Sequence, residues 1–288
     1  MYPASFEYHA PATLKDALGL LGKLPDAKIL AGGHSLVPMM KLRLAQPKHI
    51  IDLRKVSGLS GIKEDKGVLA IGAMTTHWEI ESSALVKSKI PVLTETAALI
   101  GDPAVRNKGT MGGALAHADP AADWPAPVIA LGAEFVCEGP KGRRTVKVDD
   151  WFKGLMSTAV GDDELLVEIR IPIPGAGTGA AYMKFPHPAS RFAVAGVAAV
   201  VTLDGKGACT KAGVGVTGAG TKAIRAKGVE AALTGKTLDK ATIEAAAQKA
   251  SDGVDVQADL QGSEEYKAHL VRVFARRAIE AAAQRAKG

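Results

Sequence analysis

The sequence predicts an α+β protein of two or three compact units, and three observations lead to this prediction. The chain has 288 residues, of which 47% are hydrophobic, so it can build more than one core. Its first part alternates short apolar runs with amphipathic segments, which predicts interleaved strands and helices. Its last part has three strand-like runs followed by three helical stretches rich in alanine, lysine and glutamate, an order typical of α+β domains.

The first unit is predicted to be a helix followed by a strand, a glycine pair, a helix and another strand. PATLKDALGLLGKLP has apolar residues at helical spacing, with Thr13 as its expected N-cap. The buried-strand pattern AKILA leads into glycines 32–33, and the next helix has Ser35 as its expected N-cap. KHIIDL is again typical of a buried strand. Residues 27–53 therefore form a predicted β-Gly-Gly-α-β unit.

A second unit begins after a polar turn with the strand pattern VLAIGA. PVLTETAALIG predicts a helix that ends at Gly101, and AADWPAPVIALGAE predicts another over residues 121–132, for which Asp119 is the expected N-cap. FVCEGPKGRRTVKV predicts a hairpin that turns at residues 139–142, and ELLVEIRIPIP a strand.

PGAGTGA at 174–180 is the expected linker, because small residues and glycines follow a strand that stops at prolines. Three strands, AAYMKF, FAVAGVAAVVTL and ACTKAGVGVT, and then helices are expected beyond it. The predicted division is a first domain at 1–176, with subdomains at about 1–55 and 56–176, and a C-terminal domain at 177–288.

Composition argues against several functions. The net charge is only +6 and aromatics make up 5%, without the basic stripe and stacking aromatics of nucleic-acid binding. No apolar run approaches the roughly 20 residues of a membrane helix, and we expect no secretory signal in MYPASFEYHA, which has neither a basic nor an apolar region. Cys137 and Cys209 lack a CxxC spacing, so we expect a cytoplasmic chain whose metal–sulfur chemistry lies on another chain. His34 and His117 are expected to be polar loop residues, and no metal site is predicted.

The stretch KILAGGHS, Lys28 to Ser35, has the form of a phosphate-binding turn. A strand ends at a glycine pair and a helix starts at once, so free N–H groups face the turn. Glycine lets a phosphate approach the backbone without a Cβ clash. A tight turn that binds no ligand would have the same sequence pattern, so these residues alone leave both interpretations open.

The stretch NKGTMGGALAHADPAADWPA, residues 107–126, is a second candidate segment. Thr110 and glycines 112–113 offer a hydroxyl and open backbone, while Asp119 and Asp123 add carboxylates. A paired glycine is unfavourable in a plain helix, so we expect something bulky and polar against the backbone. An acidic residue there suits a sugar or ribityl hydroxyl.

GVGVTG, residues 213–218, matches the GxGxxG dinucleotide fingerprint letter for letter. A true fingerprint follows the first strand of a βαβ unit and has an acidic residue about 20 positions later. The run before this one is half polar, and the region after it is typical of helix and loop. We therefore predict no nicotinamide cofactor at this position.

Taken together, AGGHSLVPMMKLRLAQPKHIIDL and GTMGGALAHADPAADWPA resemble the two FAD-binding segments of the medium subunit of molybdenum hydroxylases. This group contains aerobic carbon monoxide dehydrogenase, xanthine dehydrogenase and aldehyde oxidoreductases. The resemblance covers the whole chain. It implies a two-part FAD-binding domain of the vanillyl-alcohol-oxidase/PCMH type, followed by an α+β C-terminal domain with a three-stranded antiparallel sheet and helices.

The resemblance also implies which residues hold the FAD. The expected pyrophosphate contacts are Ala31, Gly32, Gly33, His34, Ser35 and Leu36. The expected contacts along the flavin and ribityl chain are Thr110, Met111, Gly112, Gly113, Ala114 and Leu115. Asp123 matches an aspartate near the cofactor, Lys184 a lysine at the flavin edge, and Phe192 an aromatic over the ring.

This chain departs from the family pattern T-I-G-G-N at two positions. Met111 replaces isoleucine, which changes shape but not polarity. Ala114 removes a side-chain amide, so a hydrogen bond that relatives can make there is missing or comes from the backbone. We expect FAD binding to survive both changes.

The function implied is electron transfer within a molybdenum hydroxylase, most closely of the carbon monoxide dehydrogenase type. FAD on this chain would take electrons from [2Fe–2S] clusters of a small subunit, after a molybdenum large subunit oxidises the substrate, and pass them to an external acceptor. Two copies of each subunit are implied, and no catalytic residue is expected on this chain. Aldehyde, xanthine and N-heterocycle dehydrogenases stay open, as do a free-standing FAD oxidase and a nucleotide-binding module without a redox role.

Overall fold

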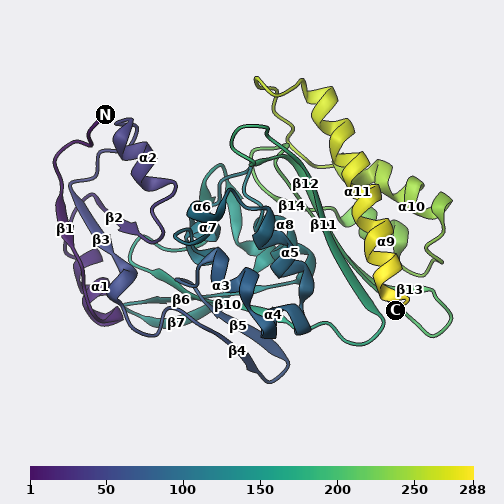
Figure 1. Cartoon of the computed structure of the whole chain (residues 1–288), viewed down its shortest axis with the longest axis horizontal. Helices are drawn as coiled ribbons and strands as arrows, with labels where there is room; N and C mark the ends of the chain where they lie inside the picture. The colour runs from purple at the N-terminus through teal and green to yellow at the C-terminus, as the bar shows by residue number, and fades with distance from the viewer.

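The computed structural model describes all residues 1–288 and has three parts in a row (Figure 1). A small sheet near the N-terminus lies beside a central sheet with its helices, and a third sheet backed by the C-terminal helices lies beyond it. Two large apolar cores fill the central and C-terminal parts, while a smaller one joins the first sheet to the central sheet. None of the helices combines the length and the apolar composition needed to cross a bilayer.

The first part confirms the predicted β-Gly-Gly-α-β unit. Its strands pair in parallel in the order β1-β3-β2. Thr13 caps the first helix, because its hydroxyl accepts a hydrogen bond from the Asp16 main-chain N–H at 3.1 Å. Ser35 stands at the expected N-cap position, but its backbone is helical and its hydroxyl caps nothing. The elements are β1 (Glu7–His9), α1 (Leu14–Leu21), β2 (Ala27–Leu30), α2 (Leu36–Lys41) and β3 (His49–Asp52).

The central part is a five-stranded antiparallel sheet in the order β4-β5-β10-β6-β7, with helices packed against it. The predicted hairpin is confirmed, since Gly139 and Gly142 face each other across its turn. The strands are β4 (Ile62–Asp65), β5 (Val68–Gly72), β6 (Glu134–Gly139), β7 (Gly142–Lys147) and β10 (Leu165–Pro172), with the small pair β8 (Phe152–Gly154) and β9 (Ser157–Thr158). The helices are α3 (His77–Ser82), α4 (Ala84–Lys89), α5 (Pro91–Leu99), α6 (Pro103–Arg106), α7 (Met111–His117) and α8 (Pro125–Leu131).

The helix predicted over residues 121–132 is shorter than expected. It begins at Pro125, whose fixed φ suits the first helical position. Asp119 does not cap it. Its carboxylate instead accepts from the Ala121 N–H at 2.9 Å and holds the turn that precedes the helix.

The C-terminal sheet has four antiparallel strands in the order β11-β12-β13-β14, not the three that were predicted. The fourth strand has only two residues, too few for a recognisable pattern, and pairs with Gly215 and Val216. The elements are β11 (Thr178–Pro186), β12 (Ala193–Leu203), β13 (Cys209–Thr217), β14 (Ile224–Arg225), α9 (Lys227–Leu233), α10 (Lys240–Ala247) and α11 (Glu264–Ala286).

Gly213 and Gly215, two of the three glycines of GVGVTG, allow close packing between the two domains. They lie in β13, which is a strand of an antiparallel sheet and not the first strand of a βαβ unit. A Cβ on Gly213 would lie 2.1 Å from the Ala130 carbonyl oxygen, and one on Gly215 would lie 2.2 Å from that of Ala126. Helix α8 of the central domain thus rests directly on the backbone of β13 (Figure 1).

We expect Gly215→Ala to lower the free energy of unfolding by about 1–3 kcal/mol, the usual cost of overpacking. The new methyl group must push α8 away from β13, because it would meet a main-chain oxygen. Gly205→Ala is the matched control, since a Cβ there meets nothing within 4 Å. Chemical denaturation of both variants measures the difference, and equal stability would contradict this account of the packing.

Candidate functional site

The two glycine segments, far apart in the sequence, lie against each other. A Cβ on Gly32 would lie 2.2 Å from the Lys108 carbonyl oxygen and 2.6 Å from the Gly109 Cα. A Cβ on Gly113 would lie 3.2 Å from that of Ala31. Glycine at position 32 is therefore required so that the β2–α2 turn can touch the main chain that leads into α7.

The β2–α2 turn carries unused hydrogen-bond donors. The main-chain N–H groups of the five residues from Gly32 to Leu36 donate to no acceptor in the chain. Gly33 has a φ of +77°, in the left-handed region that glycine adopts readily, so the chain curls at this point. Successive free N–H groups in such a curl attract an anion. The residues present therefore fit a phosphate or pyrophosphate group.

From Met111 onward, the main-chain donors of the second segment are satisfied by the protein, while the Thr110 N–H donates to no acceptor in the chain. Met111 N–H donates to the Thr75 carbonyl at 3.0 Å and Gly112 N–H to that of Ala73 at 2.9 Å. Thr110 caps α7 by accepting from the Gly113 N–H at 3.1 Å. A Cβ on Gly112 would lie 2.5 Å from that of Ala73. The bulky group expected against Gly112 is thus the protein's own backbone.

The predicted site residues around the two glycine pairs differ in how deeply they are buried. Met111 and Leu115 are fully buried in the central core, so the structure leaves neither residue open to a ligand. Ala114 is half-buried at the position where relatives have an amide. His34 is exposed and its Nδ1 lies 3.1 Å from the Gly32 carbonyl oxygen, while Ser35 and Leu36 are half-buried.

A cavity of about 300 Å³ lies where the first and central parts meet. Besides the glycine turn, it is lined by Arg54, Thr76 and Lys108, none of which the sequence singled out. Arg54 is held by Asp52, to which its Nε donates at 2.8 Å. The pattern Thr76-His-Trp-Glu79 is a capping-box signature that could have placed Thr76 at a helix start.

Asp123 and Lys184, two other predicted site residues, form a buried ion pair between the domains. The Lys184 ammonium lies 2.9 Å from the Asp123 carboxylate, and Tyr182 donates to the same carboxylate at 2.6 Å. Burial raises the pKa of Asp123 and lowers that of Lys184, and their mutual attraction opposes both shifts. Lys184 also donates to the carbonyl oxygens of Leu99 at 3.0 Å and Arg191 at 2.6 Å, so each of its protons has a protein acceptor.

Phe192 follows directly after Arg191 in the loop that joins β11 to β12. Arg191 has a φ of +62°, and the Lys184 ammonium holds its carbonyl. The Phe192 side chain is 43% exposed, so it is not part of the C-terminal core. An aromatic ring is thereby left open at the edge of a rigidly held loop.

A short chain of contacts connects this ion pair to the glycine segments. Trp124, the neighbour of Asp123, donates its indole N–H to His77 Nδ1 at 3.0 Å. The His77 main-chain N–H in turn donates to the Gly109 carbonyl at 2.9 Å. The ring of His77 is buried beside Gly109, where an added Cβ would lie 2.7 Å from Nε2. These contacts place the ion pair and the second glycine segment in one connected, buried group.

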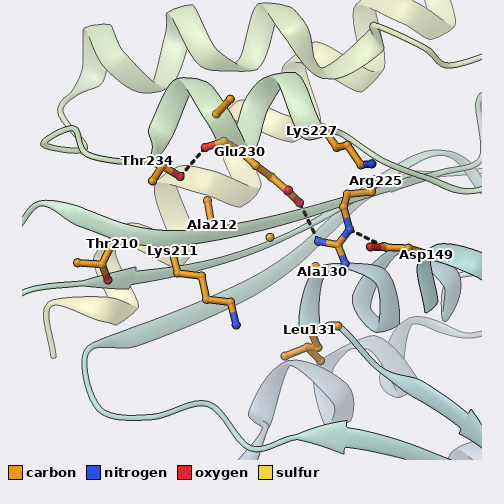
Figure 2. A pocket seen from close by; sticks show the side chains of 13 residues that line it. Ala130, Leu131, Asp149, Thr210, Lys211, Ala212, Arg225, Lys227, Glu230 and Thr234 are labelled. Atoms are coloured by element: carbon orange, nitrogen blue, oxygen red, sulfur yellow. Dashed lines mark hydrogen bonds and ion pairs between the residues drawn. The ribbon is translucent and has the colours of Figure 1, made fainter. Parts of the chain in front are cut away.

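A second cavity, of about 680 Å³, lies elsewhere, between α8, β13 and α9 (Figure 2). Arg225 crosses it and donates to Asp149 at 2.7 Å, to Glu230 at 2.9 Å and to the Ile129 carbonyl at 2.6 Å. Its guanidinium is thus already engaged, and Lys211 and Lys227 are the other cations that line the cavity. The cavity has no glycine turn with free N–H groups, so we do not place the cofactor there.

His77, buried in the central part, has an imidazole whose protonation at low pH affects its hydrogen bond to Trp124. Burial lowers the pKa of its imidazole from 6.5 to about 4, and the positive charges of His34 and Arg106 act in the same direction. The Trp124 hydrogen bond requires an unprotonated Nδ1, so the neutral ring carries its proton on Nε2. Protonation would break this contact inside the core.

We expect the His77 contribution to stability to be complete above pH 6.5 and to be lost as the pH falls from 6.5 toward 4. The unfolded chain binds a proton in this range and the folded chain does not, which lowers the free energy of unfolding by about 3 kcal/mol. Denaturation across this range measures the slope, which His77→Asn should flatten. His269→Gln, at an exposed position on α11, is the control. Equal slopes in wild type and His77→Asn would contradict the assignment.

Comparison with known proteins identifies the family. Residues 4–174 match the family model described as the FAD binding domain in molybdopterin dehydrogenase, and residues 180–282 match the CO dehydrogenase flavoprotein C-terminal domain. The carbon monoxide dehydrogenase medium chain of Hydrogenophaga pseudoflava is 44% identical over 98% of both chains.

Two solved structures support the same assignment. Carbon monoxide dehydrogenase from Hydrogenophaga pseudoflava, in a form lacking the Mo-pyranopterin moiety, matches with 45% identity and a TM-score of 0.96 over 99% of each chain. Quinoline 2-oxidoreductase from Pseudomonas putida 86 matches with 34% identity and a TM-score of 0.94 over 100% of each chain. The chain therefore belongs to the family of FAD-binding chains of molybdopterin dehydrogenases that end in a carbon monoxide dehydrogenase flavoprotein C-terminal domain.

Proposed function

We propose that this chain is the FAD-containing electron-transfer subunit of a molybdenum hydroxylase. It takes electrons from [2Fe–2S] clusters of a partner subunit and passes them to an external acceptor. The observation that carries the proposal is the glycine turn, which has five unused N–H groups and whose Gly32 and Gly33 line a cavity, in a chain of an FAD-binding family. Bound FAD would supply the redox chemistry, while this chain supplies binding and orientation.

The pyrophosphate of FAD is assigned to the turn from Ala31 to Leu36, because its free donors match an anion. The segment from Thr110 to Leu115 has a different task in this proposal. Its N–H groups from Met111 onward are occupied by the protein, and only that of Thr110, which lines the cavity, is free, so the segment shapes the floor of the site and holds the turn in place. Contacts from it to the ribityl chain would come from carbonyls and from the edge of Ala114.

Phe192 is proposed to cover one face of the flavin ring, as its exposed phenyl group is free to stack. Asp123 and Lys184 are proposed to act as positioning residues. The ammonium is already saturated by Asp123, Leu99 and Arg191, so its influence on the flavin would pass through the loop that carries Phe192. Lys184 was expected at the flavin edge, and this proposal gives it an indirect role there instead of a direct hydrogen bond to the flavin.

The carbon monoxide dehydrogenase type is favoured over other molybdenum hydroxylases. Identity is 45% to the carbon monoxide dehydrogenase structure and 34% to quinoline 2-oxidoreductase, at nearly equal coverage. Aldehyde, xanthine and N-heterocycle dehydrogenases form the alternative, since the substrate would be selected by the molybdenum subunit.

We further propose that the assembly is cytoplasmic and contains two copies of each subunit. Within this chain we propose a domain boundary near residue 176 and a first domain of the vanillyl-alcohol-oxidase/PCMH type.

Assembly with its partners tests this function directly. We expect the chain to co-elute with the iron–sulfur and molybdenum subunits in size exclusion, through contacts of at least about 1,200–2,000 Å². Carbon monoxide should then bleach the flavin absorbance of the complex, whereas a complex lacking the iron–sulfur subunit should stay yellow. Aldehydes and N-heterocycles serve as the substrate panel. An isolated chain that turns over an organic substrate would establish the free-standing oxidase instead.

Gly32→Val should weaken FAD binding by at least tenfold, about 1.4 kcal/mol. The reason is that a side chain would collide with the Lys108 carbonyl and separate the two glycine segments. Flavin absorbance per chain after gel filtration measures the loss, with circular dichroism as the check on folding. Gly19→Ala is the control, because a Cβ at this position in α1 meets nothing within 4 Å. A folded Gly32→Val protein with full flavin would refute the site assignment.

A further inference from the structure

Three potential metal ligands from distant parts of the sequence meet on the first sheet. Glu7 and His9 lie two residues apart on the edge strand β1, so their side chains share one face. The parallel register pairs Glu7 with His49 of β3, which brings the second imidazole to the same face. The sequence singled out none of these three residues, which together form a group that could hold a metal ion.

The distances within this cluster are those of a coordination site. His9 Nε2 and His49 Nδ1 are 3.3 Å apart, and Glu7 Oε2 lies 3.4 Å from His49 Nδ1 and 3.9 Å from His9 Nε2. An ion with tetrahedral bonds of about 2.0–2.1 Å holds its ligand atoms about 3.3 Å apart. The three atoms thus need shifts of only a few tenths of an ångström to share one ion.

The surroundings of the cluster also suit a cation. The His9 and His49 side chains are 23% and 15% exposed, so the sheet holds both rings, while the Glu7 side chain is 73% exposed and can adjust. The neighbouring cation, Lys48, has Asp26 as its partner at 3.5 Å. Tyr8 lies between the two β1 ligands in sequence and binds Asp52 instead.

We propose that Glu7, His9 and His49 form a binding site for a divalent transition ion of the Zn²⁺ class, with water completing the coordination. Two imidazoles and one carboxylate select Zn²⁺, Ni²⁺ or Cu²⁺ over Mg²⁺ and Ca²⁺, which require oxygen ligands. The ion ties the edge strand to β3, with which it pairs over three residues. Binding therefore stabilises the sheet whose β2 strand leads into the glycine turn.

Zinc titration of the chelator-treated, full-length protein tests the site, with a chromophoric chelator as competitor. We expect one Zn²⁺ per chain bound tightly by wild type, and binding at least tenfold weaker in His49→Gln and in His9→Gln. His269→Gln is the matched control, because that histidine is exposed on α11 and belongs to no group of three potential ligands. Co²⁺ should give visible ligand-field bands in wild type that His49→Gln loses.

Thermal unfolding provides the second readout. Zn²⁺ should raise the unfolding temperature of wild type and of His269→Gln, while Mg²⁺ at the same concentration should not. His9→Gln and His49→Gln should unfold like wild type without zinc, and Glu7→Gln offers a third variant should either fail to fold. Equal zinc affinity and stoichiometry in wild type and the folded ligand variants would overturn the proposal and leave the cluster as a hydrogen-bonded group.

Discussion

The arrangement of the whole first domain depends on the contact between Gly32 and the main chain at Lys108 and Gly109. No side chain can stand between these two backbones, because even a Cβ would lie 2.2 Å from a carbonyl oxygen. The contact fixes the β2–α2 turn relative to the central sheet. It thereby determines where the five unused N–H groups of that turn are presented.

The segment between α7 and α8 carries this geometry onward to the C-terminal domain. The Pro120 carbonyl accepts from the Gly218 N–H at 2.7 Å, and the Ala121 carbonyl accepts from the Ala193 N–H at 3.0 Å. Asp123 then forms the buried ion pair with Lys184. Removing one partner of such a pair leaves an uncompensated buried charge, which typically costs about 3–5 kcal/mol. The two domains are therefore joined by directional polar contacts as well as apolar packing.

Glycine has three different physical roles in this chain, although the sequence motifs look alike. Gly33 adopts a left-handed φ that curls a turn of free donors. Gly32 and Gly112 let two backbones touch within the first domain, and Gly215 lets α8 rest on β13. Only the first role concerns an anion directly. A glycine motif thus predicts a close approach, but not whether a ligand, a helix or another backbone makes that approach.

The sequence by itself determined the local elements, because their signals act over a few residues. The Thr13 cap, the β-Gly-Gly-α-β unit, the hairpin at Gly139 and the family assignment all came from adjacent residues or contiguous motifs. Tertiary structure alone decided which atoms lie against Gly112 and which acceptors the Lys184 ammonium binds. It also decided that the His9 and His49 rings lie side by side. Such contacts depend on strand register and domain docking, which join residues that carry no mutual signal along the chain. The two-residue strand β14 was not predicted for the same reason. Its residues are a strand because they pair with β13, and not because of a pattern in their own sequence.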